Sequence, residues 1–157
     1  MVLTEIKNKI EHYCAYQERC HREVKEKLRS FFLTSDEIDE IIVHLIENNF
    51  LNEERFAINF SRGKFRIKNW GKIRIESELK ARNISKTIIT KSLKEISVDD
   101  YIEAFNCLAE KQWESIRETN LLKKKKKFID YLLRKGWESD LIYEKLNVLV
   151  KSETNLD

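Results

Sequence analysis

Leu51-Asn-Glu-Glu-Arg-Phe-Ala-Ile-Asn-Phe-Ser-Arg62 and Trp70-Gly-Lys-Ile-Arg-Ile-Glu-Ser-Glu-Leu-Lys-Ala-Arg-Asn-Ile84 are the two stretches that decide the fold. The first begins with Asn52, a helix cap, followed by two glutamates that suit the positive end of a helix dipole. The second predicts a basic helix that stops at Asn83, a residue type that tolerates left-handed backbone. Between them, residues 63–69 predict a basic connector that loosens the end of the first helix.

The second of these predicted helices has apolar residues on more than one side. Trp70, Ile73 and Ala81 fall on one side, and Ile75 and Leu79 fall on another. A helix with a single core-facing side shows one apolar stripe. We therefore expect this helix to be contacted on two faces.

Composition and spacing favour helices along the whole chain. The 157 residues include no proline and three glycines, and 36% of them are charged. Apolar residues recur at intervals of three and four, which predicts nine amphipathic helices. Helix-end signals support this, among them a capping box from Thr34 to Glu37, a cap at Ser85 and a stop at Gly136. The sequence predicts an all-α protein.

An internal repeat of about fifty residues is visible when Leu28, Leu79 and Leu132 are aligned, at spacings of 51 and 53 residues. After each leucine come a helix stop, an apolar residue, a polar cap and an apolar anchor. The stops are Phe32-Leu33, Asn83 and Gly136. Each unit is too small to bury its own apolar face, so neighbours must stack. We expect three tandem three-helix repeats in an elongated, curved array, with repeats at residues 1–51, 52–98 and 99–157.

Charge is distributed unevenly over these repeats. Residues 1–51 hold seven Lys/Arg and ten Asp/Glu, giving −3. Residues 52–98 hold twelve against five, giving +7, and residues 99–157 hold eleven against twelve, giving −1. A basic middle third suits a polyanion or an acidic protein groove.

The third repeat also contains five consecutive lysines, Lys123–Lys127. Such a run is usually a solvated helix face, but five in a row surround the helix, so some must lie along the core with their ammonium groups in water. In the repeat alignment Lys124 and Lys125 match Gly71 and Lys72, so the two basic clusters could form one stripe. Aromatic residues near these clusters are expected as packing anchors, with base stacking the alternative. They are Phe65, Trp70 and Trp137.

Metal, catalytic and cofactor motifs are missing from the sequence. The histidines and cysteines lack the paired spacing of a zinc site, so we expect the thiols in the core and the histidines on the surface. They are His12, His21, His44, Cys14, Cys20 and Cys107. Neither a nucleophile elbow nor a glycine-rich phosphate loop is present. We expect no enzyme activity, no metal and no cofactor. With no apolar run of about 20 residues, no signal peptide and an odd number of cysteines, we expect a reduced cytoplasmic protein.

Four segments lie in register over the three repeats. They are Arg19-Cys-His-Arg-Glu-Val-Lys-Glu-Lys-Leu28, Leu51–Arg62, Gly71-Lys-Ile-Arg-Ile-Glu-Ser-Glu-Leu79 with Ile84, and Phe128-Ile-Asp-Tyr-Leu-Leu-Arg-Lys-Gly-Trp137. Together these segments resemble the RecX family, which regulates the RecA recombinase. The resemblance covers residues 12–150. It departs from the family at His21, where a small hydroxyl residue is common, and at Asn83, where glycine is usual.

The resemblance implies a monomeric, non-enzymatic modulator that lies along the groove of the RecA filament on single-stranded DNA. ATP turnover, strand exchange and SOS co-protease activity would fall. The residues expected to contact DNA or acidic filament surface are Lys64, Arg66, Lys68, Lys72, Arg74, Lys123, Lys124, Lys125, Lys126 and Lys127. Those expected to meet basic recombinase surface are Asp36, Glu37, Asp39 and Glu40.

Two other functions compete with this one. A freestanding DNA-binding helical module without sequence preference would lose affinity steeply with salt, whether or not a recombinase is present. An inert helical scaffold would neither bind DNA nor act on a recombinase.

Overall fold

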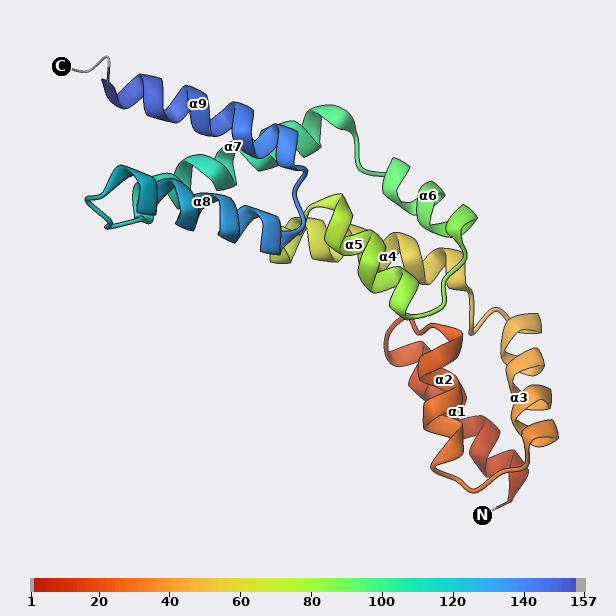
Figure 1. Cartoon of the computed structure of the whole chain (residues 1–157). Helices are drawn as coiled ribbons and strands as arrows, with labels where there is room; N and C mark the ends of the chain where they lie inside the picture. Colours follow the sequence, from red (N-terminus) through yellow and green to blue (C-terminus); the bar gives the residue numbers. More distant parts are fainter. Residues whose placement is uncertain (1, 155–157) are drawn as a thin grey trace. The chain divides into compact units, whose positions relative to one another are not determined.

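The structure is a computed structural model that describes residues 2–154. Over that range it contains nine α-helices and no strand, so the all-α prediction is confirmed (Figure 1). The helices are α1 (Leu3–Tyr16), α2 (His21–Arg29), α3 (Ser35–Glu47), α4 (Glu53–Lys68), α5 (Lys72–Ala81), α6 (Lys86–Lys94), α7 (Val98–Ser115), α8 (Leu121–Lys135) and α9 (Ser139–Thr154).

The helices form two compact units, and each is described by itself. The first unit consists of α1, α2, α3, α4 as far as Phe60, and the segment Leu79–Ser92. The second unit consists of the segment Ser61–Glu78 and the chain from Leu93 onward. The middle of the chain therefore contributes to both units, and the repeat boundaries after residues 51 and 98 stay a prediction.

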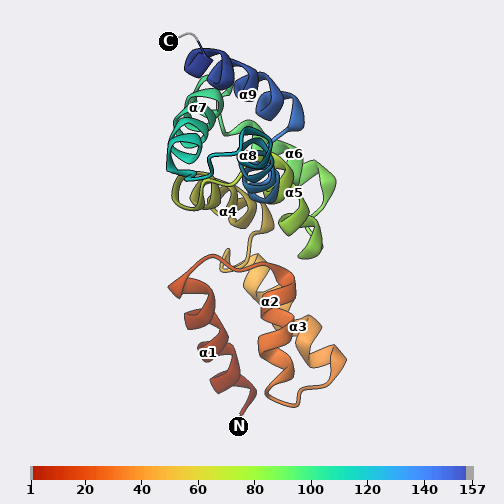
Figure 2. The ribbon, with the colours of Figure 1, turned by 60° about the vertical axis from the view of Figure 1, so that its left-hand side comes forward.

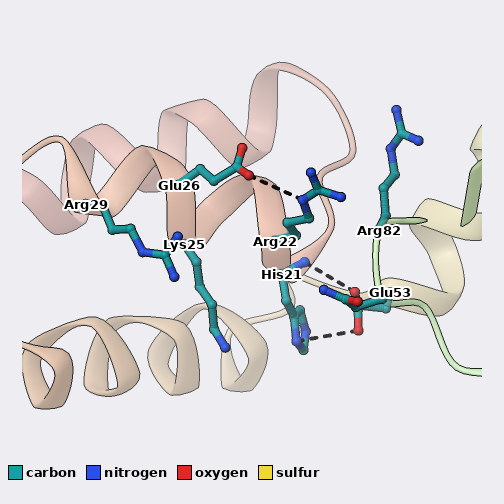
Figure 3. A pocket seen from close by; sticks show the side chains of 8 residues that line it. His21, Arg22, Lys25, Glu26, Arg29, Glu53 and Arg82 are labelled. Carbon is teal, nitrogen blue, oxygen red and sulfur yellow. Dashed lines mark hydrogen bonds and ion pairs between the residues drawn. The ribbon is translucent and has the colours of Figure 1, made fainter. Parts of the chain in front are cut away.

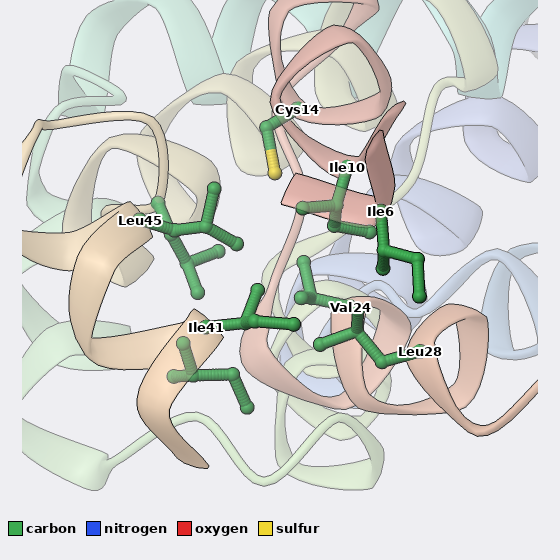
Figure 4. Packing of buried hydrophobic residues seen from close by; sticks show 9 residues of the cluster. Ile6, Ile10, Cys14, Val24, Leu28, Ile41 and Leu45 are labelled. Atoms are coloured by element: carbon green, nitrogen blue, oxygen red, sulfur yellow. The ribbon is translucent and has the colours of Figure 1, made fainter. Parts of the chain in front are cut away.

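In the first unit α2 packs against both α1 and α3, as Figures 1 and 2 show. One stripe of α1, with residues four apart, faces this core. Its members lie together with buried residues of α2 and α3 (Figure 4). The cluster is Ile6, Ile10, Cys14, Val24, Leu28, Ile41, Ile42, Leu45 and Leu51.

In the second unit α7, α8 and α9 contact one another in pairs (Figures 1 and 2). Its core is rich in aromatic rings. Trp137 lies 4.6 Å from Tyr101 and 5.3 Å from Phe105, measured between ring centroids. Trp113 meets Phe128 edge to face at 5.6 Å. Large rings bury much apolar surface per residue, so a few of them supply much of the core of this unit.

The predicted caps at Thr34 and Asn52 and the three aligned helix stops are confirmed. Thr34 and Glu37 form the reciprocal capping box, and the side chain of Asn52 accepts the N–H of Arg55 at 2.9 Å. The aligned stops all have left-handed backbone, with φ of 58° at Phe32, 60° at Asn83 and 95° at Gly136. A shared, uncommon conformation at three aligned positions supports the repeat alignment.

Three expectations are wrong. The basic connector at residues 63–69 is largely helical, because α4 continues through Gly63 to Lys68. α5 buries one face, since Ile75 and Leu79 are fully buried while Ile73 is 52% exposed. Not every cysteine is a core residue, because Cys107 is exposed.

Candidate functional site

Two basic residues, Lys64 of α4 and Arg74 of α5, lie against Trp70 in the second unit. Together with Arg66, Lys68, Lys72 and Lys135 they form a group that we call the Trp70 cluster. The ammonium of Lys64 lies 5.0 Å from the Trp70 ring, and the guanidinium of Arg74 lies 4.2 Å from it. Trp70 itself is 9% exposed, as expected for a packing anchor. The structure thus brings Lys64 and Arg74, ten residues apart in the chain, onto one aromatic ring by cation–π contact.

Lys72 and Arg74 are also tied to the end of α8 and to α7. Arg74 donates from Nη1 to the carbonyl of Arg134 at 3.2 Å. Lys72 donates its main-chain N–H to the hydroxyl of Tyr101 at 2.8 Å, and its ammonium lies 4.8 Å from that ring. These two side chains are half-buried, so they serve the packing as well as the electrostatic surface.

Arg66 and Lys68 differ from them because both side chains are exposed in the last turn of α4. The carbonyl of Lys68 accepts a hydrogen bond from the ammonium of Lys135, at 3.1 Å. Sequence reasoning missed Lys135 as a member of this cluster. Only its place beside Gly136, at the end of the helix aligned with α5, could have indicated it.

The start of α5 and the end of α8 meet backbone to backbone. We call this contact the second junction, because it joins the second helices of the second and third repeats. The N–H of Gly71 donates to the carbonyl of Lys135 at 2.8 Å, and the N–H of Ile73 donates to that of Gly136 at 3.1 Å. A Cβ atom on Gly71 would lie 2.3 Å from the Gly136 carbonyl oxygen. Only glycine allows so close an approach, and this contact fixes Lys72 and Arg74 beside Lys135.

Buried aromatic residues pack beside the second junction and form hydrogen bonds there. Phe65 and Trp137, the other predicted packing anchors, are 8% and 1% exposed. Trp137 donates from Nε1 to the carbonyl of Asn69 at 3.0 Å. The hydroxyl of Tyr101 donates to the Glu138 carboxylate, and burial is the main reason that its pKa is raised. Tyr101 therefore stays a neutral hydroxyl that links α7, α5 and the segment before α9.

The lysine run lies in the first two turns of α8. Lys124 is the member that faces the core, with its side chain 15% exposed. Its ammonium lies 4.0 Å from the Trp113 ring and donates to Glu153 at 3.1 Å. The bonds from Lys124 and Trp113 lower the pKa of Glu153, so this carboxylate is ionised at neutral pH. The predicted core-facing lysine is confirmed, and it is Lys124.

The other four lysines point outward to different degrees. Lys126 pairs with Asp130 at 2.9 Å, and Lys127 pairs with Glu118 at 3.5 Å, both with more than half of the lysine side chain exposed. Within residues 2–154, neither Lys123 nor Lys125 pairs with a carboxylate. The run therefore presents four ammonium groups on the surface of α8.

The run and the Trp70 cluster are not in contact. The run lies at the start of α8, and the cluster lies beside the end of α8. The eleven residues from Lys124 to Lys135 correspond to about 16 Å along a helix axis. The structure thus places two basic patches on the second unit, one at each end of the same helix.

The acidic candidates lie on α3 in the first unit. Glu37 is used by the capping box, where hydrogen bonds from Thr34 lower the pKa of its carboxyl group. Glu40 lies 3.7 Å from the ammonium of Lys7. Asp36 and Asp39 are exposed. Of these four candidates, Asp36, Asp39 and Glu40 are therefore the ones that face outward.

The first unit also contains a basic pocket that sequence reasoning missed (Figure 3). It has a volume of about 460 Å³ and lies between α2, the start of α4 and the turn after α5. Arg22, Lys25 and Arg29 share a face of α2, a spacing that the sequence does show. The lining residues are His21, Arg22, Lys25, Glu26, Arg29, Glu53, Arg82 and Asn83.

The described part of the chain has neither a membrane-spanning helix nor a metal-binding cluster. None of the helices in the described part of the chain is both long enough and apolar enough to span a membrane. Over residues 2–154, no three His, Cys, Asp or Glu side chains come together as they would around a metal ion.

Comparisons with known proteins agree on one family. The model of the second three-helix domain of RecX matches residues 52–93, and that of the third three-helix domain matches residues 99–146. Regulatory protein RecX of Bacillus cytotoxicus is 31% identical over 130 residues, which is 83% of this chain and 48% of that protein. The chain thus spans about half the length of the curated relatives it matches.

Solved structures agree as well. The crystal structure of RecX from Lactobacillus salivarius has a TM-score of 0.80 and 28% identity, and the match covers 94% of this chain and 96% of that one. A second crystal structure, of a regulatory protein RecX, also has a TM-score of 0.80, covers 92% and 71%, and at 19% identity supports the fold alone. The predicted array of three-helix repeats is confirmed by these matches, and the chain belongs to the RecX family of regulatory proteins.

Proposed function

We propose that this chain binds the filament of the RecA recombinase on single-stranded DNA and lowers its ATP hydrolysis, strand exchange and SOS co-protease activity. It acts in the cytoplasm as a regulator and not as an enzyme. Family membership supports the regulatory role. The two basic patches of the second unit support an anionic partner, either the DNA backbone or an acidic filament surface.

The observation that carries the proposal is the position of the lysine run. Its five residues occupy the first two turns of α8, where the helix dipole is positive and lysine is unfavourable by about 0.3–1 kcal/mol for each charge in the first turn. No acidic residue lies in that first turn. A charge run placed against the preference of its own helix is a local conflict of the kind found at functional sites.

The Trp70 cluster would contribute a second contact. Arg66 and Lys68 are exposed beside Lys64, Lys72 and Arg74, whose orientations are set by aromatic rings and main-chain carbonyls. Side chains held in place lose less entropy on binding than mobile ones do. On α3, Asp36, Asp39 and Glu40 are the outward-facing acids that would meet basic recombinase surface.

The test is the single-stranded-DNA-dependent ATPase of the cognate RecA, titrated with this chain and with two variants. The first variant changes Lys123, Lys125, Lys126 and Lys127 to alanine and keeps Lys124, which packs on Trp113. The control removes four exposed lysines elsewhere, Lys9, Lys86, Lys94 and Lys111. We expect inhibition at ratios well below one chain per recombinase subunit, weakened about tenfold in the first variant and little in the control.

Other results would select the competing functions. Absence of inhibition at every ratio, with DNA binding that falls steeply as salt is raised, would replace the proposal with a freestanding DNA-binding module. Absence of both effects in a folded protein would leave an inert scaffold.

A further inference from the structure

We propose that the basic pocket of the first unit is a binding site for a phosphate group, carried either by a small anion or by the backbone of a nucleic acid. The pocket shares no residue with the surface proposed above, and the proposal does not rest on that function. It rests on the charge of the lining, the way the arginines are held, and the chemistry of the pocket wall.

The lining carries more positive than negative charge, and its acids are already paired. Four lysine or arginine residues face two glutamates, an excess of two positive charges with His21 neutral. Glu26 pairs with Arg22 at 3.3 Å. Glu53 accepts the main-chain N–H of His21 at 3.3 Å and lies 3.5 Å from its Nδ1 (Figure 3). An anion that enters therefore meets uncompensated positive charge.

Two of the arginines are held in place before any ligand arrives. Arg22 donates from Nε to Glu26 and from Nη1 to the carbonyl of Ala81. The guanidinium of Arg82 lies 4.7 Å from the Phe60 ring. A guanidinium has five N–H donors in a planar fork, so Arg22 keeps others for a phosphate oxygen. Such charge-assisted bonds are stronger than neutral ones.

The wall of the pocket selects the class of ligand. All eight lining residues are polar or charged, and a volume of about 460 Å³ is within the usual range of small-molecule sites, about 300–1,000 Å³. Most such sites are lined by apolar side chains, which this pocket lacks. A ligand in this pocket must therefore be recognised by charge and hydrogen bonds, and the excess positive charge favours phosphate.

The three histidines of the chain offer a local test by NMR. His21 lines the pocket, whereas His12 is exposed on α1 and His44 pairs with Glu11 at 2.7 Å. The intact chain would be titrated with pyrophosphate at constant ionic strength, and separately with a ten-nucleotide oligothymidylate. We expect the imidazole resonances of His21 to shift while those of His12 and His44 stay in place.

A pair of matched variants locates the site. Lys25→Gln with Arg29→Gln removes two positive charges from the pocket, and both residues are exposed. Lys9→Gln with Lys111→Gln removes two exposed charges elsewhere. We expect the pocket variant to bind about tenfold more weakly and the control to change less than twofold, because only the former loses charge-assisted bonds.

The two ligands distinguish the two sources of phosphate. Tighter binding of pyrophosphate than of the oligonucleotide would support a small phosphorylated ligand, and the reverse order would support a nucleic-acid backbone. Unshifted His21 resonances with both ligands, or equal weakening in the pocket and control variants, would overturn the proposal.

Discussion

The second helices of the three repeats, α2, α5 and α8, meet at two junctions. One junction is a backbone contact, and the other is made by a side chain. In the second junction, Gly71 brings the start of α5 onto the backbone of Lys135 and Gly136 at the end of α8. In the first junction, the start of α2 meets the end of α5, and Cys20 occupies the position aligned with Gly71. There the link is the Arg22 side chain, which donates to the Ala81 carbonyl.

Both junctions satisfy the same main-chain groups. Ala81 and Arg134 each lie two residues after an aligned leucine, and each carbonyl accepts from an arginine. The first N–H of α2 donates to Glu53, and the first N–H of α5 donates to Tyr101. The two junctions thus use equivalent main-chain groups, although the partners that bind the N–H groups differ. At the first junction a charged pocket lies beside the contact, whereas at the second the backbones of Gly71 and Gly136 touch.

The largest expected effect is that of Gly71→Ala. The new Cβ would lie 2.3 Å from the oxygen and 2.6 Å from the carbon of the Gly136 carbonyl, which are backbone atoms. We expect the free energy of unfolding to fall by about 3 kcal/mol, measured by urea denaturation followed by circular dichroism. Gly63→Ala is the control, since no atom lies within 4 Å of its Cβ position. It should stabilise α4 by about 0.5–1 kcal/mol. Equal stability of the two variants would refute the close approach.

Thiol labelling sharpens the comparison at the first junction. Burial raises the pKa of Cys20 and of Cys14 to about 11, whereas Cys107 is exposed. At pH 8 we expect a disulfide reagent to modify Cys107 at least about a hundredfold faster than the other two, because the thiolate is the reacting form. Cys14 lies in the helical core, so labelling of Cys20 ahead of Cys14 would report opening of the first junction alone. Labelling of Cys20 at the rate of Cys107 would contradict its burial.

Tyr101→Phe removes the hydroxyl that closes the second junction. That hydroxyl accepts the Lys72 N–H and donates to Glu138, so both partners would be left unsatisfied in a half-buried site. We expect a loss of about 2 kcal/mol in the free energy of unfolding. Tyr143→Phe, at a tyrosine that is 51% exposed, should change it by less than about 0.5 kcal/mol. Similar losses in both variants would show that the hydroxyl of Tyr101 has no special role.

Glu53→Gln is the corresponding change at the first junction and has the smallest expected effect. The amide keeps an acceptor for the His21 N–H but loses the charge beside α2 and at the start of α4. We expect a loss of about 1 kcal/mol. Glu54→Gln, next to it, loses the same charge at the start of α4 and an exposed pair with Lys91, but no bond to His21, and should cost about 0.5 kcal/mol. A loss of stability in Glu53→Gln as large as that in Tyr101→Phe would contradict this ranking. The bond from the His21 N–H to Glu53 would then matter as much as the bonds of the Tyr101 hydroxyl.

Much of the candidate surface was predictable from the sequence. Helical spacing required one lysine of the run to face the core, and Lys124 does so. The three aromatic residues expected as anchors are all buried. Lys135 was not predictable, because its approach to Lys68 depends on how α8 meets α5.

The basic pocket was hidden for a different reason. The net charge of −3 over residues 1–51 is a sum in which the acidic residues of α3 outweigh the basic residues of α2. Helix periodicity places Arg22, Lys25 and Arg29 on one face. It does not say that Glu53 and Arg82 stand opposite them.

The sequence by itself determined the helices, their caps, the repeat and the family, because each depends on neighbours within about four residues or on spacing along the chain. Only the tertiary structure decided how successive second helices meet. That choice depends on atoms about sixty residues apart, and at Gly71 it depends on a missing Cβ atom whose importance no local pattern shows.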